Sequence, residues 1–279
     1  MIRARQTCFW GELRAATIAS SRTLSVAVTE MLMPVRIPQC RTSKCRRESP
    51  IGLFRSDQST SALEDGKYRI ATLQEVIALA RDEGAKRGRA VGLYIETKHP
   101  SYFRNLGLPL EEKLLSVLRA EGLDGPDASV FIQSFETGNL QMLAKQTLLP
   151  LIQLMAAEEG PFDAPELRYA ALATPAGLAK IAAYARGIGV EKAMVIPRTK
   201  EDQLAAPSSL VGDAHAAGLL VHVWTFRPES YFLPKDKRSN GSPAEHGDLR
   251  GELRQFLNSG VDGVFSDYVP AARAEAGKP

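Results

Sequence analysis

The chain is 279 residues long, which suits one large domain or two small ones and allows a sizeable hydrophobic core. A net charge of +3 excludes a protein that is basic overall, so we expect no nucleic-acid partner for the chain as a whole. The three cysteines all lie within the first 45 residues, and we expect no disulfide framework from them. The sequence contains no apolar run of about eighteen residues, so we expect no integral membrane segment.

The first 60 residues differ from the rest of the chain in composition. Residues 1–55 hold ten arginines and lysines against three glutamates, and they show no sustained hydrophobic period. We therefore expect residues 1–60 to be an atypical basic segment, poorly ordered or irregular, in front of a domain over residues 61–279. The opening residues do not predict an ordinary secretory signal peptide, so the sequence leaves the location open.

Composition alone leaves two interpretations of this basic segment. The cluster of arginines and lysines at residues 41–47 lacks interleaved aromatic residues, which makes nucleic-acid binding a minor option. An arginine- and serine-rich, acid-poor start is also typical of a transit peptide.

From Tyr68 onward the sequence alternates between helix and strand signals. A helix over residues 72–81 begins with Thr72 as its N-cap and Glu75 at the capping-box position. Residues 91–95 are a short apolar run that predicts a buried strand. Further helices are expected over residues 109–121, 137–146, 174–187, 208–217 and 249–258. Further strands are expected over residues 129–135, 149–155, 193–196, 219–226 and 261–266.

Strands that alternate with helices indicate right-handed βαβ units and a parallel sheet. Six such units in roughly 200 residues make up most of an eight-fold barrel. The sequence therefore predicts an α/β fold of the TIM-type (β/α) barrel, incomplete at its N-terminal end. An open, doubly wound sheet is the alternative, but no glycine-rich phosphate loop follows any of the expected strands.

Charged residues follow the strand at residues 91–95. The period of two along a strand places Glu96 and Lys98 on the same side, and His99 on the opposite side. A carboxylate beside an ammonium is costly to bury without a task. At the carboxyl-end rim of a barrel, Glu96 would be a metal ligand next to Lys98 as a phosphate-binding cation. The alternative is a structural ion pair at a strand end.

Other candidate site residues end the later strands. The Gln133 amide is suited to a substrate hydroxyl, or else to a hydrogen bond inside the barrel. Trp224 and Phe226 are expected to share a face, and they are either ligand contacts or ordinary core. Asp267 ends the last strand, where we expect it to orient a rim lysine or to cap the final helix.

The four histidines are poor candidates for catalysis. His99 follows the rim residues, and His215 is expected on a helix surface. His222 lies inside a strand and is interpreted as a satisfied core histidine, although a place in the barrel lining is the alternative. His246 lies in the polar loop at residues 230–248 and is expected to be solvated.

Four segments resemble, in order and spacing, the glycerophosphodiester phosphodiesterase family. They are residues 95–98 (Ile-Glu-Thr-Lys), 133–135 (Gln-Ser-Phe), 223–226 (Val-Trp-Thr-Phe) and 260–267 (Gly-Val-Asp-Gly-Val-Phe-Ser-Asp). The resemblance runs from about Tyr68 to Pro270. Longer details at residues 99–103 and 226–234 resemble the periplasmic or secreted bacterial branch.

The resemblance implies a metal-dependent phosphoric diester hydrolase. Such an enzyme converts a small-molecule glycerophosphodiester and water into sn-glycerol 3-phosphate and an alcohol such as choline or ethanolamine. By resemblance, Glu96 matches a metal ligand for Ca²⁺ or Mg²⁺ and Lys98 matches the lysine beside the phosphate. Substrate binding then also falls to Gln133, Trp224 and Phe226.

The family pattern also requires motifs that this sequence lacks. These are a His-Arg-Gly at the end of the first strand, a Glu-x-Asp ligand pair at the second, and a His-Asp soon after; the first histidine here is His99. We therefore assign no catalytic residue and expect weak metal binding and impaired activity. The alternative function is a non-catalytic remnant or phosphate-polyol binding module. A third interpretation of residues 1–60, which we favour, is a sequence produced by a wrong start or a shifted reading frame.

Overall fold

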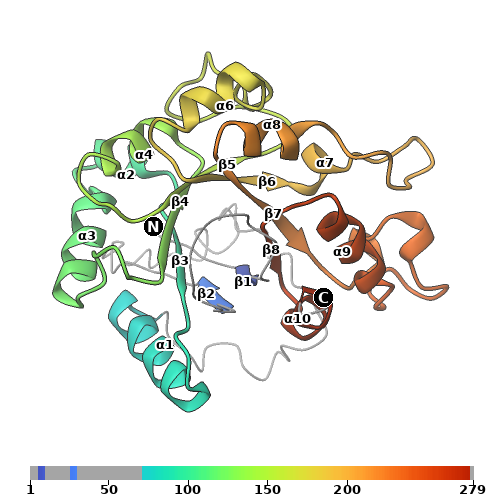
Figure 1. Ribbon diagram of the computed structural model, residues 1–279, viewed down its shortest axis with the longest axis horizontal. Helices are drawn as coiled ribbons and strands as arrows, with labels where there is room; N and C mark the ends of the chain where they lie inside the picture. The colour runs from blue at the N-terminus through green and yellow to red at the C-terminus, as the bar shows by residue number, and fades with distance from the viewer. Residues whose placement is uncertain (1–5, 10–25, 30–70, 277–279) are drawn as a thin grey trace, which may run out of the picture.

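Six consecutive parallel strands form a strongly curved sheet, and the helices between them cover its outer face (Figure 1). The computed structural model describes residues 71–276 and two short strand segments, residues 6–9 and 26–29. Each parallel strand pairs with the next one along the chain. The strands are β3 (Leu93–Glu96), β4 (Val130–Ser134), β5 (Leu151–Met155), β6 (Gly187–Glu191), β7 (Leu220–Phe226) and β8 (Gly263–Ser266). The predicted TIM-type barrel, incomplete at its N-terminal end, is confirmed.

Two further strands extend this sheet with the opposite direction. Strand β1 (Gln6–Phe9) pairs antiparallel with β8, and β2 (Val26–Thr29) pairs antiparallel with β1. The strands of a (β/α) barrel are all parallel, so β1 and β2 are not ordinary barrel strands. The expected boundary near residue 60 lies outside the described residues and stays a prediction.

The helices begin where the sequence places their caps. Thr72 and Glu75 form the predicted capping box at the start of α1 (Leu73–Arg87), and the hydroxyl of Thr174 accepts a hydrogen bond from Gly177 N in α6 (Pro175–Ile181). The other expected helices are α3 (Leu110–Ala120), α4 (Thr137–Leu143), α8 (Leu210–Ala216) and α9 (Leu249–Asn258). Additional helical segments are α2 (Pro100–Asn105), α5 (Tyr169–Leu172), α7 (Lys192–Val195), α10 (Val269–Ala276), η2 (Ser230–Phe232) and η3 (Lys235–Lys237). Within the described residues, no helix has the length and apolar character needed to cross a membrane.

The predicted strand at residues 193–196 is wrong, because this stretch forms helix α7 and the strand is β6 instead. A Cβ atom at Gly187 would lie 2.7 Å from the carbonyl oxygen of Leu220, and one at Gly189 would lie 2.5 Å from Cδ2 of Leu154. The two glycines therefore leave room for the large side chains of β5 and for the backbone of β7. Glycine is depleted in strands generally, so the sequence pattern misplaced the element.

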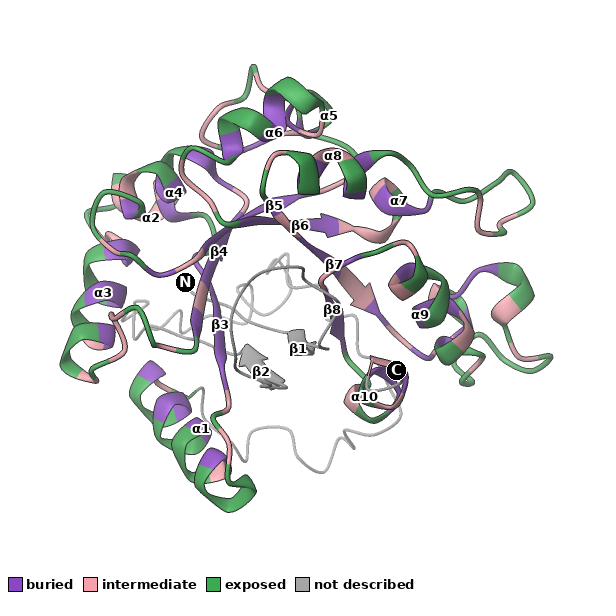
Figure 2. Cartoon of the chain, in the orientation of Figure 1, coloured by how far each residue is buried: buried purple, intermediate pink, exposed green. Residues whose placement is uncertain are grey.

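The strands are buried on both faces, whereas the outer surfaces of the helices are exposed (Figure 2). Ile95, Ile132 and Ile188 belong to the apolar layers between the sheet and the helices. Alternate residues fill the barrel interior, where Tyr94, Ile152 and Phe265 form a separate cluster. This inner cluster is the floor beneath the carboxyl ends of the strands.

Replacing Gly187 by alanine should lower the free energy of unfolding by about 1–3 kcal/mol, since the new methyl group overpacks the barrel. The clash is with backbone, and Cδ1 of Ile152 also lies 3.0 Å from the added atom. Urea unfolding measures the change. Gly212→Ala is the matched control: no heavy atom lies within 4 Å of its added Cβ, and alanine in helix α8 should stabilise by roughly 0.5–1 kcal/mol. Equal effects of the two substitutions would contradict the packing argument.

Candidate functional site

Strand register brings the predicted rim residues to one end of the barrel. Glu96 is the register partner of Gln133 across β3 and β4, and Glu191 is the partner of Trp224 across β6 and β7. Glu96 and Gln133 each lie two residues beyond an inward-facing ring, and those two rings stack with centroids 5.2 Å apart. Glu96 and Gln133 thus face the interior at the carboxyl ends of the strands, where barrel enzymes place their sites.

Glu96 and Lys98 form the predicted ion pair at this rim. Nζ of Lys98 lies 3.5 Å from Oε1 of Glu96; the carboxylate side chain is 8% exposed, and the lysine side chain is 46% exposed. Burial raises the pKa of the Glu96 carboxyl, and the Lys98 ammonium opposes that rise. Oε1 of Glu96 has no hydrogen-bond partner, so the pair leaves acceptor capacity inside the barrel.

Gln133 is buried, and neither atom of its side-chain amide has a hydrogen-bond partner. The alternative role of a barrel-interior hydrogen bond is therefore not what the structure shows. Leaving a buried amide unsatisfied costs about 1–3 kcal/mol per group. Such a group is suited to a ligand that brings its own hydroxyl or phosphoryl oxygen.

Hydrogen bonds to Thr97 fix the backbone that carries Lys98. Thr97 N donates to the carbonyl oxygen of Gln133 at 3.0 Å, and the Ser134 hydroxyl donates to the carbonyl of Thr97 at 3.1 Å. The Thr97 hydroxyl donates to Oδ1 of Asn139 at 2.7 Å, and the Asn139 amide donates to Glu111 at 2.6 Å. Lys98 therefore leaves the barrel from a backbone that is held on both sides.

Glu136 is a buried carboxylate that the sequence analysis missed. Its Oε2 accepts a hydrogen bond of 2.9 Å from Ser101 N, in the first turn of α2. Burial raises the pKa of Glu136. The only sequence signal was an acid directly after the Gln-Ser-Phe segment.

Just before α2, His99 has a left-handed backbone with φ of 49°, and its ring meets Phe162 edge-on at 5.6 Å.

Trp224 lies where the sequence placed it, but Phe226 does not share its face. The Trp224 indole donates to the carbonyl oxygen of Gly189 at 3.0 Å and meets the Phe135 ring edge-on. Phe226 is fully buried and packs on Phe256 of helix α9, with ring centroids 5.0 Å apart. The prediction of a shared face is wrong because the β7–β8 register shifts between Val223 and Phe226.

Asp267 contacts an arginine rather than the expected lysine. Oδ2 of Asp267 lies 3.0 Å from Nε of Arg227, which also lies 3.8 Å from Glu229. The Arg227 guanidinium is stacked 4.3 Å above the Phe232 ring. Arg227 is a rim residue that the sequence analysis overlooked, although its segment, residues 226–234, was noted.

The histidines occupy the expected environments. His222 is fully buried, its Nδ1 lies 2.7 Å from the Tyr94 hydroxyl, and its ring meets those of Tyr94 and Phe131 inside the barrel, so it occupies the alternative place in the barrel lining. Burial lowers the pKa of His222 to about 3. His215 on α8 pairs with Asp262 at 2.8 Å, and His246 is exposed beside the Tyr268 ring.

The described residues do not fit a divalent cation. Within residues 71–276 no group of three His, Cys, Asp or Glu side chains is positioned to hold a metal ion. Glu96 has the Lys98 ammonium beside it, Glu191 accepts a hydrogen bond from Ala157 N at 2.9 Å, and Asp267 pairs with Arg227. Hard cations require about six oxygen ligands, and the described side chains do not supply them, so no catalytic role is assigned to a metal at this rim.

The family model and the curated relatives that match this chain name the same family. The family model of the glycerophosphoryl diester phosphodiesterase family matches residues 10–271. The chain is 31% identical over 218 residues to glycerophosphodiester phosphodiesterase GDPD6 of Arabidopsis thaliana, covering 74% of this chain and 55% of that protein. It is 25% identical over 218 residues to a glycerophosphodiester phosphodiesterase of Haemophilus influenzae, covering 72% and 57%. The chain thus spans little more than half the length of these curated relatives.

A solved structure supports the fold. A protein from Silicibacter pomeroyi, described as a glycerophosphoryl diester phosphodiesterase, matches with a TM-score of 0.51 and 20% identity. The match covers 75% of this chain and 56% of that one. At this identity the likeness concerns the arrangement of strands and helices.

The buried His222 should make the protein less stable in mild acid. Its folded pKa lies below the unfolded value of about 6.5, so the unfolded state binds the extra proton and stability falls as pH falls from there toward 3. Between about pH 7.5 and pH 5 this group should remove about 2 kcal/mol from the free energy of unfolding. Urea unfolding at both values should show this loss in the wild type and not in His222→Gln. His246→Gln, on an exposed loop, should behave like the wild type, and an unchanged slope in His222→Gln would refute the assignment.

Proposed function

The chain belongs to the glycerophosphoryl diester phosphodiesterase family, and we propose that it is a glycerophosphodiester phosphodiesterase-like hydrolase with impaired turnover. The substrate is a small glycerophosphodiester, and the products are sn-glycerol 3-phosphate and an alcohol. The curated relatives extend well beyond the part that this chain matches, so the whole relatives' activity enters here as a proposal.

One observation carries the proposal: Glu96 and Gln133, which are register partners at the carboxyl ends of β3 and β4, have buried polar atoms without hydrogen-bond partners, and the Lys98 ammonium lies 3.5 Å from Glu96. Lys98 is half exposed and would bind a phosphoryl oxygen. The Gln133 amide would donate to, or accept from, a glycerol hydroxyl. The Gln133 amide has no competing hydrogen-bond partner, so a ligand gains that contact without breaking another. The Lys98 ammonium is shared with Glu96 at 3.5 Å.

The indole of Trp224 supplies the apolar side of the proposed pocket. It contacts the Phe135 ring and stays partly exposed, whereas its N–H is already bonded to Gly189. A flat apolar face beside a phosphate suits the glycerol carbons. Phe226, which packs against α9, is left out of the proposed substrate contacts.

The proposed impairment of turnover rests on the lack of a histidine placed to act as general acid or base. A general acid or base contributes about 10²–10⁴-fold to rate. His222 is held by Tyr94 inside the core, and burial together with Lys98 lowers the pKa of His99, which sits beyond the rim. Neither histidine is suited to protonate a leaving alkoxide at the Glu96–Lys98 pair.

Among residues 71–276, a divalent cation, Ca²⁺ or Mg²⁺, would meet a single suitable carboxylate, Glu96, in this proposal. The neighbouring Lys98 ammonium competes with the cation for the same oxygen. We therefore propose that any metal binding by Glu96 is weak, no tighter than about millimolar.

A second candidate function is a non-catalytic module that binds phosphate-polyols. It uses the same three residues, Glu96, Lys98 and Gln133, and requires no proton donor. The unsatisfied Gln133 amide favours it equally, because binding needs only the pocket. Turnover, rather than affinity, distinguishes the two functions.

Removing the Lys98 charge should weaken the binding of sn-glycerol 3-phosphate about tenfold or more, because a hydrogen bond to a charged group contributes roughly 1.5–3 kcal/mol. Titration calorimetry of Lys98→Gln against the wild type measures the loss. Lys180→Gln removes the same charge from the exposed surface of α6 and should bind like the wild type. Equal affinities of Lys98→Gln and wild type would remove the phosphate contact from the proposal.

Hydrolysis of glycerophosphocholine should be slower than in a complete family member by about 10²–10⁴-fold, the contribution of a missing proton donor. A coupled assay for released glycerol 3-phosphate, with Ca²⁺ or Mg²⁺ present, measures it. Robust turnover would overturn the impairment. Binding with no detectable turnover would favour the binding module.

A further inference from the structure

A separate cavity lies between the first and the last of the helices in residues 71–276. It has a volume of about 190 Å³, and α1 and α10, which flank the same part of the ring, contribute its walls (Figure 1). Val76, Leu79 and Val269 make these walls apolar, and Leu79 is 51% exposed. Arg89, in the loop that precedes β3, also lines the cavity, so the cavity lies at the opposite end of β3 from Glu96.

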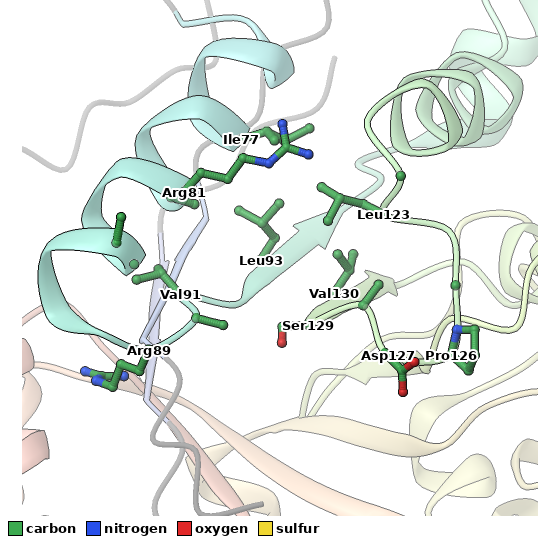
Figure 3. A pocket seen from close by; sticks show the side chains of 17 residues that line it. Ile77, Arg81, Arg89, Val91, Leu93, Leu123, Pro126, Asp127, Ser129 and Val130 are labelled. Atoms are coloured by element: carbon green, nitrogen blue, oxygen red, sulfur yellow. The ribbon is translucent and has the colours of Figure 1, made fainter.

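Arg89 stands between this cavity and a larger one. The larger cavity, about 630 Å³, lies between α1 and the loop at residues 122–130. Figure 3 shows Arg89 at the margin of the larger cavity, with its guanidinium turned away from Leu93 and Leu123. Nη1 of Arg89 is buried and has no hydrogen-bond partner.

The positive charge in the smaller cavity is not matched by acids in the described part of the chain. Arg273 of α10 lines the cavity with Arg89, and burial together with repulsion from Arg273 lowers the pKa of Arg89. Glu83, the acid of the lining, pairs with Lys86 at 2.8 Å and with Arg87. Arg87 also lines the cavity, and Glu83 pairs with it. Arg89 and Arg273 therefore line the same space, and neither makes an ion pair with an acid among the described residues.

The position of Arg89 is fixed by its backbone. Arg89 N donates to the carbonyl oxygen of Gly84 at 3.1 Å, which closes the C-terminus of α1. A Cβ atom at Gly84 would lie 3.0 Å from the Arg89 carbonyl oxygen, so the loop packs directly on the helix. The backbone that carries the Arg89 side chain is thus held in place before any ligand arrives.

We propose that this cavity is an anion site for a small organic phosphate with a short apolar group. A tetrahedral phosphate offers oxygens to two guanidiniums at once, whereas a planar carboxylate matches a single guanidinium fork. The apolar walls receive the alkyl part. The site uses none of the residues at the other end of the barrel, so it stands independently of the proposed function.

Titration calorimetry of the full chain with n-butyl phosphate and with inorganic phosphate, at constant ionic strength, tests the site. Both should bind, n-butyl phosphate more tightly. Arg89→Gln and Arg273→Gln should each weaken n-butyl phosphate binding about tenfold or more, because charged hydrogen bonds are lost. Arg250→Gln removes an exposed arginine of α9 and should leave binding unchanged. In a Lys98→Gln background, which removes the proposed phosphate contact at the other end of the barrel, Arg89→Gln and Arg273→Gln should weaken binding by the same factor, which separates the two sites.

The melting temperature gives a second readout. Arg89→Met removes a guanidinium whose buried Nη1 has no hydrogen-bond partner, so the ligand-free protein should melt about 2–4 °C higher, and n-butyl phosphate should no longer raise the value. A structural role for Arg89 would lower the melting temperature instead and would overturn the proposal. The absence of n-butyl phosphate binding in the wild type, its loss in Arg250→Gln, or equal binding by Arg89→Gln and the wild type would overturn it as well.

Discussion

The packing of aromatic rings inside the barrel is the constraint on which the candidate site depends. Tyr94 stacks on Phe131, meets Phe265 edge-on at 5.0 Å, and shares a 2.7 Å hydrogen bond with His222. These side chains come from four different strands, so they fix the relative register of the sheet. Because alternate residues face inward, the next inward positions necessarily lie at the rim.

Polar groups at the rim carry a cost that the apolar layers offset. Each unsatisfied buried group, such as the Gln133 amide or Oε1 of Glu96, costs about 1–3 kcal/mol. A fully buried aliphatic or aromatic side chain contributes roughly 1.5–3 kcal/mol, and the barrel has many of them. The same imbalance recurs at Arg89, at the opposite end of β3. Both ends of the barrel therefore retain polar atoms that folding alone does not satisfy.

The candidate site was partly readable from the sequence because its residues follow strands directly. Glu96 and Lys98 could be placed together from the period of two, and the ion pair has the expected partners. The sequence did not reveal the Arg227–Asp267 pair or the role of Glu136, because both contacts join segments that lie far apart along the chain. Glu136 holds the first turn of α2, thirty-five residues earlier.

The sequence by itself determined the alternation of helices and strands, since caps such as Thr72 and apolar runs are local signals. It also determined the family, because the ordered motifs are local sequence signals. Only the tertiary structure decided that the Gly187 stretch is a strand and that Phe226 turns toward α9. Both outcomes depend on packing between strands. Glycine fits in β6 because the neighbouring strands leave no room for a Cβ atom, and a register shift between β7 and β8 turns the Phe226 ring outward. Such constraints act between strands, and no local pattern encodes them.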